Sequence, residues 1–264
     1  MVLDASGSSQ FVSALLIAGA CFDEGVEIVH DGPQIPSRPY LDMTAGMLRD
    51  RGLVIEQPDP DTWIVHPGDL RARDEAIEPD LMNASAFLCA ALVTAGSVTT
   101  AWPEHTLQNA DGVLTALEAF GARVDRTPGA VTITGPPEGP RGADIDLRDV
   151  AELTCVLACV AAVAEGPSRL RGVGHIRGHE TDRLAALASE LTGLGASVAE
   201  TEDGLTITPG ALHGGTFRTY ADHRMAHAAA VLGLVVDGVE LDDVDCTTKT
   251  MPDFPGLWST MLGR

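Results

Sequence analysis

The sequence predicts an α/β (α+β) protein built from repeated βαβαββ units, and three observations lead to this prediction. Four glycines that each follow an apolar helical run and precede a β-like run recur at intervals of 71, 70 and 72 residues: Gly25, Gly96, Gly166 and Gly238. Three glycines in the position of a helix C-cap recur at intervals of 69 and 74 residues: Gly52, Gly121 and Gly195. A β-hairpin pattern follows two of these C-cap glycines.

The first helix of each unit is expected to be buried, because a helix that is apolar all round needs cover on every face. The sequence is almost wholly apolar in all four copies of this helix: Phe11–Ala20, Ala84–Val93, Leu153–Ala164 and Met225–Val236.

The second helix of each unit is expected to be amphipathic; in the third copy a leucine stripe runs from Leu184 to Leu194. Hairpins follow around a Pro-Gly turn and an Asp-Gly turn, pairing Ala122–Val124 with Val131–Thr134 and Ala196–Val198 with Leu205–Thr208. A strand such as Ala143–Leu147 precedes the first helix. The copies begin near Asp4, Asp80, Asp146 and Asp222, and the last ends after its second helix.

Composition excludes several classes of partner. The formal net charge of −21 argues against nucleic acid or an anionic membrane, and the longest apolar runs, such as Ala226–Val236, are too short to span a bilayer. The five cysteines are odd in number, and none has a neighbour at metal-ligand spacing. With no signal-peptide pattern at the N-terminus, we expect a reduced cytoplasmic protein without a metal or cofactor.

Lys249 is the only lysine among 17 basic residues. Coding bias toward arginine is one explanation. The other is that this position needs a compact ammonium group, which a guanidinium cannot replace.

Unusual polar residues stand where the helices are expected to begin, and helix N-termini offer free N–H groups to anions. Capping explains a serine or aspartate there. It does not explain Arg183 and Arg224, because a cation opposes the helix dipole. These arginines indicate either a bound anion or local pairing with Asp182 and Asp222.

Two further features are candidates for chemistry. Glu152 precedes an apolar helix and could cap it or act as a general base, and Asp149 is an equally placed competitor. His175 and His179 lie in a glycine-rich loop, which by itself is a weak signal.

Five stretches, in order and spacing, resemble the motifs of the 5-enolpyruvylshikimate-3-phosphate synthase family. These are Ser8–Phe11, Pro36–Tyr40, Gly178–Leu184, Tyr220–Ala226 and Thr247–Phe254. The resemblance covers nearly the whole chain. It implies an enolpyruvyl transferase-like, two-domain inside-out barrel of six βαβαββ units, which is incomplete here.

The resemblance also implies roles for individual residues. Shikimate 3-phosphate would be held by Ser8, Ser9, Gln10, Ser37, Tyr40, Glu152, His175 and His179, and phosphoenolpyruvate by Gln10, Arg183, Arg224 and Lys249. Glu152 and Lys249 would be catalytic. This chain has Glu152 where most members have Asp, His175 where many have Asn, and His179 where many have Lys. A cationic His179 would keep the contact that the lysine makes.

The implied reaction is addition of the 5-hydroxyl of shikimate 3-phosphate to C2 of phosphoenolpyruvate, followed by loss of phosphate. Both substrates are small anions. The family's N-terminal segment has no counterpart here, so residues 1–77 would be a remnant of the N-terminal domain. Residues 78–264 would be the C-terminal domain, with three units, the last of them truncated.

Three explanations stay open: a truncated sequence, half of a split enzyme that needs a complementing N-terminal segment, or a non-catalytic homologue that binds phosphorylated ligands. UDP-N-acetylglucosamine enolpyruvyl transferase, which shares the fold, is the alternative enzyme.

Overall fold

The computed structural model describes residues 1–264 and divides into two compact units. The first unit comprises Met1–Glu78 and His105–Asn109, and the second comprises Pro79–Glu104 and Ala110–Arg264. No helix of the structure combines the length and the apolar character that crossing a bilayer requires.

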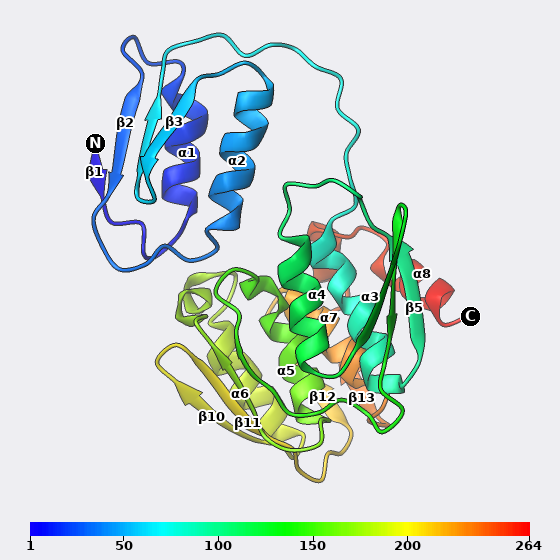
Figure 1. The fold of residues 1–264 in the computed structure, drawn as a ribbon. Helices are drawn as coiled ribbons and strands as arrows, with labels where there is room; N and C mark the ends of the chain where they lie inside the picture. The colour runs from blue at the N-terminus through cyan, green and yellow to red at the C-terminus, as the bar shows by residue number, and fades with distance from the viewer. The chain divides into compact units, whose positions relative to one another are not determined.

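The first unit is one complete βαβαββ module (Figure 1). Its strands form a sheet in the order β1-β2-β4-β3, in which β1 and β2 are parallel and the other neighbours are antiparallel. Helices α1 and α2 pack against each other. The elements are β1 (Val2–Leu3), α1 (Gln10–Gly19), β2 (Val26–His30), α2 (Pro39–Asp50), β3 (Ile55–Asp59) and β4 (Thr62–Val65).

The second unit repeats this module. Its sheet β8-β9-β11-β10 has the same strand order and directions, the sheet β5-β7-β6 lacks the first strand, and β12 and β13 form the parallel pair that opens a module. The elements are α3 (Leu81–Thr94), β5 (Ser97–Ala101), α4 (Ala110–Ala119), β6 (Arg123–Thr127), β7 (Ala130–Thr134), β8 (Asp144–Asp146), α5 (Thr154–Ala162), β9 (Ser168–Arg171), α6 (Arg183–Gly193), β10 (Ser197–Thr201), β11 (Gly204–Thr208), β12 (Gly215–Phe217), α7 (His223–Leu232), β13 (Val239–Leu241) and α8 (Phe254–Met261).

The predicted repeat and the predicted α/β class are therefore confirmed. The C-cap glycines end helices as expected: Gly121 and Gly195 have φ of +100° and +104°, a conformation that costs a residue with a Cβ. Both predicted hairpins form, β6 with β7 and β10 with β11.

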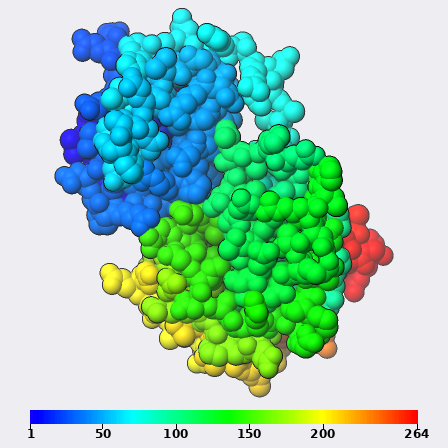
Figure 2. All heavy atoms as spheres, viewed as in Figure 1, coloured from blue at the N-terminus to red at the C-terminus, as the bar shows by residue number.

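The first helices of the second unit form its centre. Helices α3, α5 and α7 contact one another, and every residue of α5 is buried. In Figure 2 the green surface of this unit belongs to the segments around α4, which lie outside these central helices. Three short 3₁₀ helices, Ala151–Leu153, Gly174–Gly178 and Asp245–Lys249, lead into α5, α6 and α8.

The prediction of a buried first helix is wrong for α1. Only Val12, Leu16 and Gly19 are buried, whereas Phe11 and Ile17 are 54% and 55% exposed. The physical reason is that α3, α5 and α7 cover one another, while the first unit contains a single helix of this type.

Candidate active site

The helix starts of the second unit converge on one region. Arg224 Nη1, in the first turn of α7, donates a hydrogen bond to the carbonyl oxygen of Met82 at the start of α3, at 3.2 Å. Asn83 Nδ2 lies 3.4 Å from the carbonyl oxygen of Thr250, the residue after Lys249. The positive ends of helix dipoles are therefore gathered here together with the side chain of Arg224, an arrangement that suits an anion.

Arg183 is the first residue of α6, and its guanidinium donates hydrogen bonds to three side chains. Its Nε and Nη2 donate to the two carboxylate oxygens of Asp222 at 2.8 and 3.1 Å. Nη2 also donates to Glu180 Oε2 at 2.7 Å, and Nη1 to His179 Nδ1 at 3.0 Å. The side chains of Arg183 and Asp222 are 3% and 0% exposed, so this is a buried ion pair.

The structure shows which carboxylate is the main partner of Arg183. Asp222 pairs with it from the start of α7, 39 positions away, which is not the pairing between sequence neighbours that the local alternative proposed. Asp182 has a different role, because it accepts the N–H of Ala185 at the start of α6 and pairs with Arg177.

Glu180 is the residue that sequence reasoning missed. Its carboxylate joins the two candidate cations, because one oxygen accepts from Lys249 Nζ and the other from Arg183 Nη2. Burial acts to raise the pKa of Glu180, but the hydrogen bond from Lys249 and the nearby Arg183 outweigh it and lower that pKa to about 2. The spacing of Glu180 and Arg183, three residues apart at a helix start, was the available signal.

We expect the stability of the chain to fall as the pH drops from about 4.5 towards about 2, because Glu180 titrates at its ordinary 4.5 when unfolded and lower when folded. Protonation therefore favours the unfolded chain across this window. Urea unfolding at a series of pH values should show a shallower fall for Glu180→Gln than for the wild type. The exposed Glu118→Gln serves as the control, and equal slopes for all three proteins would contradict the expectation.

Glu152 and Asp149 differ in their surroundings. Glu152 lies in the 3₁₀ helix before α5, and its Oε2 is buried without a hydrogen-bond partner in the protein, whereas Asp149 is exposed. Buried polar atoms are normally paired. This region holds seven of the eight buried side-chain atoms without a protein partner: Asn83 Oδ1, Glu152 Oε2, Thr154 Oγ1, His175 Nε2, His223 Nδ1, Arg224 Nε and His227 Nε2.

The expectation of a cationic His179 is wrong. An arginine has only donors, so His179 Nδ1 must accept the hydrogen bond from Arg183 and the ring proton resides on Nε2. Burial and Arg183 lower the pKa of His179. His175 packs edge-on against it at 5.7 Å between ring centroids, and burial, His179 and Arg183 lower its pKa to about 4. Both rings are neutral near pH 7 and offer N–H donors, not charge.

The remaining predicted residues belong to the first unit. Ser8, Ser9 and Gln10 lie at the start of α1, and Ser37 and Tyr40 at the start of α2. Because β1 and β2 are parallel, both helices begin at the same edge of the sheet (Figure 1). Ser37 has φ of +52°, a conformation that non-glycine residues seldom adopt.

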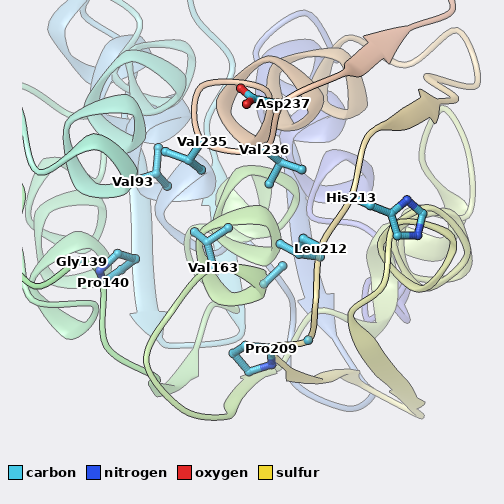
Figure 3. A pocket seen from close by; sticks show the side chains of 12 residues that line it. Val93, Gly139, Pro140, Val163, Pro209, Leu212, His213, Val235, Val236 and Asp237 are labelled. Carbon is cyan, nitrogen blue, oxygen red and sulfur yellow. The ribbon is translucent and has the colours of Figure 1, made fainter.

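A pocket of about 550 Å³ lies at the other ends of the central helices (Figure 3). Its lining includes Val93 in the last turn of α3, Val163 directly after α5, and Val236 shortly after α7. No arginine or lysine lines it. A pocket lined by the carboxylate of Asp237 and by no arginine or lysine does not suit a phosphorylated ligand, so we place the candidate site at the helix starts. No group of three His, Cys, Asp or Glu side chains is arranged to hold a metal ion.

Comparison with known proteins adds independent findings. The family model of EPSP synthase (3-phosphoshikimate 1-carboxyvinyltransferase) matches residues 1–258. Relatives named 3-phosphoshikimate 1-carboxyvinyltransferase include those of Kocuria rhizophila and Mycobacterium ulcerans, 52% and 49% identical over 265 residues. The alignments cover 100% and 99% of this chain but 59% and 61% of the relatives. The chain thus spans about three-fifths of their length.

Solved structures share the fold. EPSP synthase from Acinetobacter baumannii matches with a TM-score of 0.77 and 22% identity, covering 100% of this chain and 62% of that one. The enolpyruvyl transferase NikO from Streptomyces tendae matches with a TM-score of 0.76 and 23% identity, covering 98% and 63%. The predicted enolpyruvyl transferase-like fold is confirmed.

Proposed function

The chain belongs to the EPSP synthase family, and we propose that it provides the larger part of a 3-phosphoshikimate 1-carboxyvinyltransferase. This enzyme transfers the enolpyruvyl group of phosphoenolpyruvate to the 5-hydroxyl of shikimate 3-phosphate and releases phosphate. The observation that carries the proposal is the convergence of Arg183, Arg224 and Lys249 with unpaired buried polar atoms at the helix starts of the second unit. The names of relatives about 50% identical to the chain supply the substrates.

Phosphoenolpyruvate is assigned to the cations. Arg224 Nε is buried without a partner, and an anion at this point would accept its hydrogen. Arg183 and Lys249 are joined by Glu180, so a bound carboxylate or phosphate has to share or displace that carboxylate. In the first unit, Gln10 is the proposed additional contact.

Shikimate 3-phosphate is assigned to Ser8, Ser9, Gln10, Ser37 and Tyr40 of the first unit and to Glu152, His175 and His179 of the second. The two histidines would act as neutral donors. The unpaired Oε2 of Glu152 is available to a substrate hydroxyl.

The proposed reaction has two steps. Glu152 takes the proton of the 5-hydroxyl as the hydroxyl oxygen bonds to C2 of phosphoenolpyruvate, while Lys249 donates a proton to C3. The tetrahedral intermediate then loses phosphate from C2 and returns the C3 proton to Lys249, which restores the double bond, and the proton held by Glu152 leaves with the phosphate. Lys249 neutralises the departing phosphate, and Arg183 and Arg224 hold the anionic groups throughout. Such preorganised charges are usually the largest catalytic contribution.

We further propose that residues 1–77 belong to an N-terminal domain and residues 78–264 to a C-terminal domain, and that activity needs the family's N-terminal segment. The exposed apolar face of α1, with Phe11 and Ile17, supports this proposal. In the second unit the equivalent faces are covered by neighbouring central helices. The proposed compartment is the cytoplasm, which fits five cysteines that are all thiols.

We expect phosphate release from shikimate 3-phosphate and phosphoenolpyruvate only when the chain is mixed with the part of the Kocuria rhizophila relative that it does not match, expressed separately. Lys249→Ala should abolish this release, because the cluster loses its only ammonium group. A coupled phosphate assay on the chain, the segment and the mixture checks the expectation. The conservative Lys249→Arg separates a need for charge from a need for an ammonium.

Absence of phosphate release in the mixture, with binding of both substrates intact, would overturn the enzymatic assignment and leave a ligand-binding homologue. Release that persists in Lys249→Ala would overturn the role of this lysine.

A further inference from the structure

The segment that leads into α7 contains a strained turn. The N–H of Asp222 donates to the carbonyl oxygen of Thr219 at 2.9 Å, and the central residues Tyr220 and Ala221 have φ of +55° and +54°. Two positive φ angles make this a type I′ turn, whose central positions favour Gly, Asn or Asp. A tyrosine and an alanine adopt this conformation only where the surrounding structure holds them in it.

Two carboxylates hold the turn. Glu190 of α6 is 8% exposed; its Oε1 accepts the hydroxyl of Tyr220 at 2.7 Å and its Oε2 the N–H of Arg218 at 2.9 Å. Asp242, which follows β13, accepts both the N–H and the hydroxyl of Thr219 at 2.8 Å. The turn is therefore fixed on both sides by charge-assisted hydrogen bonds.

The turn positions Asp222, the carboxylate partner of Arg183 in the candidate site. Asp222 is the last residue of the turn, caps α7 by accepting the N–H of Arg224, and pairs with Arg183. Arg183 and Glu190 are seven residues apart on α6, which is about two helical turns, so they share one face of this helix. Helix α6 therefore contacts the turn through two side chains: Glu190 accepts a hydrogen bond from Tyr220, and Arg183 donates to Asp222.

We propose that Glu190 is a positioning residue for the anion-binding arginines. By holding the Thr219–Asp222 turn, it keeps Asp222 against Arg183 and fixes the start of α7, from which Arg224 extends. Glu190 makes no substrate contact in this scheme. The identity of the anion rests on the proposed function, whereas the role of Glu190 in the turn does not.

The test uses the full chain with inorganic phosphate and phosphoenolpyruvate as probes. We expect Glu190→Ala to weaken binding of both anions about tenfold, the order of magnitude of one lost charge-assisted hydrogen bond, as measured by titration calorimetry. Amide hydrogen exchange at Asp222 and Arg224 should become faster in the same variant.

Rescue separates positioning from a merely structural role. Asn-Gly is a preferred pair for a type I′ turn. Adding Tyr220→Asn and Ala221→Gly to Glu190→Ala should therefore restore slow exchange and bring the dissociation constants back to within about threefold of the wild type. Glu118→Ala, an exposed change on α4, should leave all these quantities unchanged.

The proposal would be overturned if amide hydrogen exchange at Asp222 and Arg224 is unchanged in Glu190→Ala. It would also be overturned if the Asn-Gly turn does not restore the anion affinity that Glu190→Ala loses. If the wild-type chain binds neither anion, the proposed ligand assignment fails. In that case, amide hydrogen exchange at Asp222 and Arg224, compared between Glu190→Ala and the variant with the Asn-Gly turn, still decides whether Glu190 holds the turn.

Discussion

Replacing Glu152 by glutamine is expected to lower kcat of the complemented enzyme by roughly a hundredfold to ten-thousandfold, the usual contribution of a positioned general base. Glutamine keeps the size of the side chain but cannot take a proton. The Oε2 atom of Glu152 is buried and has no hydrogen-bond partner in the protein, so the change removes no contact of this atom with another residue. Initial rates of phosphate release, with thermal unfolding recorded alongside, measure the effect.

Two companion variants sharpen this expectation. Glu152→Asp keeps a carboxylate that is one methylene shorter, so it should retain far more activity than Glu152→Gln. Asp149→Asn changes the competing carboxylate, which is exposed, and should leave kcat near the wild-type value. A loss in Asp149→Asn equal to that in Glu152→Gln would transfer the proposed base to Asp149.

Replacing Arg183 by methionine is expected to cost about 3–5 kcal/mol of unfolding free energy, the range found when one partner of a buried ion pair is removed. The cause is the carboxylate of Asp222, which is 0% exposed and would lose its bidentate cation. Urea unfolding of the chain gives the difference directly.

Two controls test the cause. Adding Asp222→Asn to Arg183→Met removes the uncompensated charge and keeps a good N-cap for α7, so it should recover part of the loss. Arg177→Met breaks a more exposed pair with Asp182 and Glu200 and should cost no more than about 1 kcal/mol. If Arg183→Met costs as little as Arg177→Met, the ion pair is not a stabilising element.

Most of the fold could be predicted from the sequence, because its signals are local. Glycines at 121 and 195 end helices where a positive φ is needed, and short turns join strands that are neighbours in the sequence. The interval between such signals, close to 70 residues, also predicted the repeated module.

Burial of α1 could not be predicted in the same way. Its apolar composition matches that of α3 and α5, but burial depends on how many such helices a unit contains. The first unit has one, so the face with Phe11 and Ile17 is exposed.

By itself, the sequence determined the repeat, the helix starts and which polar residues stand at them, since capping and periodicity act over a few residues. Only the tertiary structure decided which of these residues are partners. Asp222 reaches Arg183 across 39 positions, and Glu180 meets Lys249 across 69. The resulting contacts make His179 neutral and lower the pKa of Glu180, because a charge is stabilised by the groups packed around it and not by its neighbours in sequence.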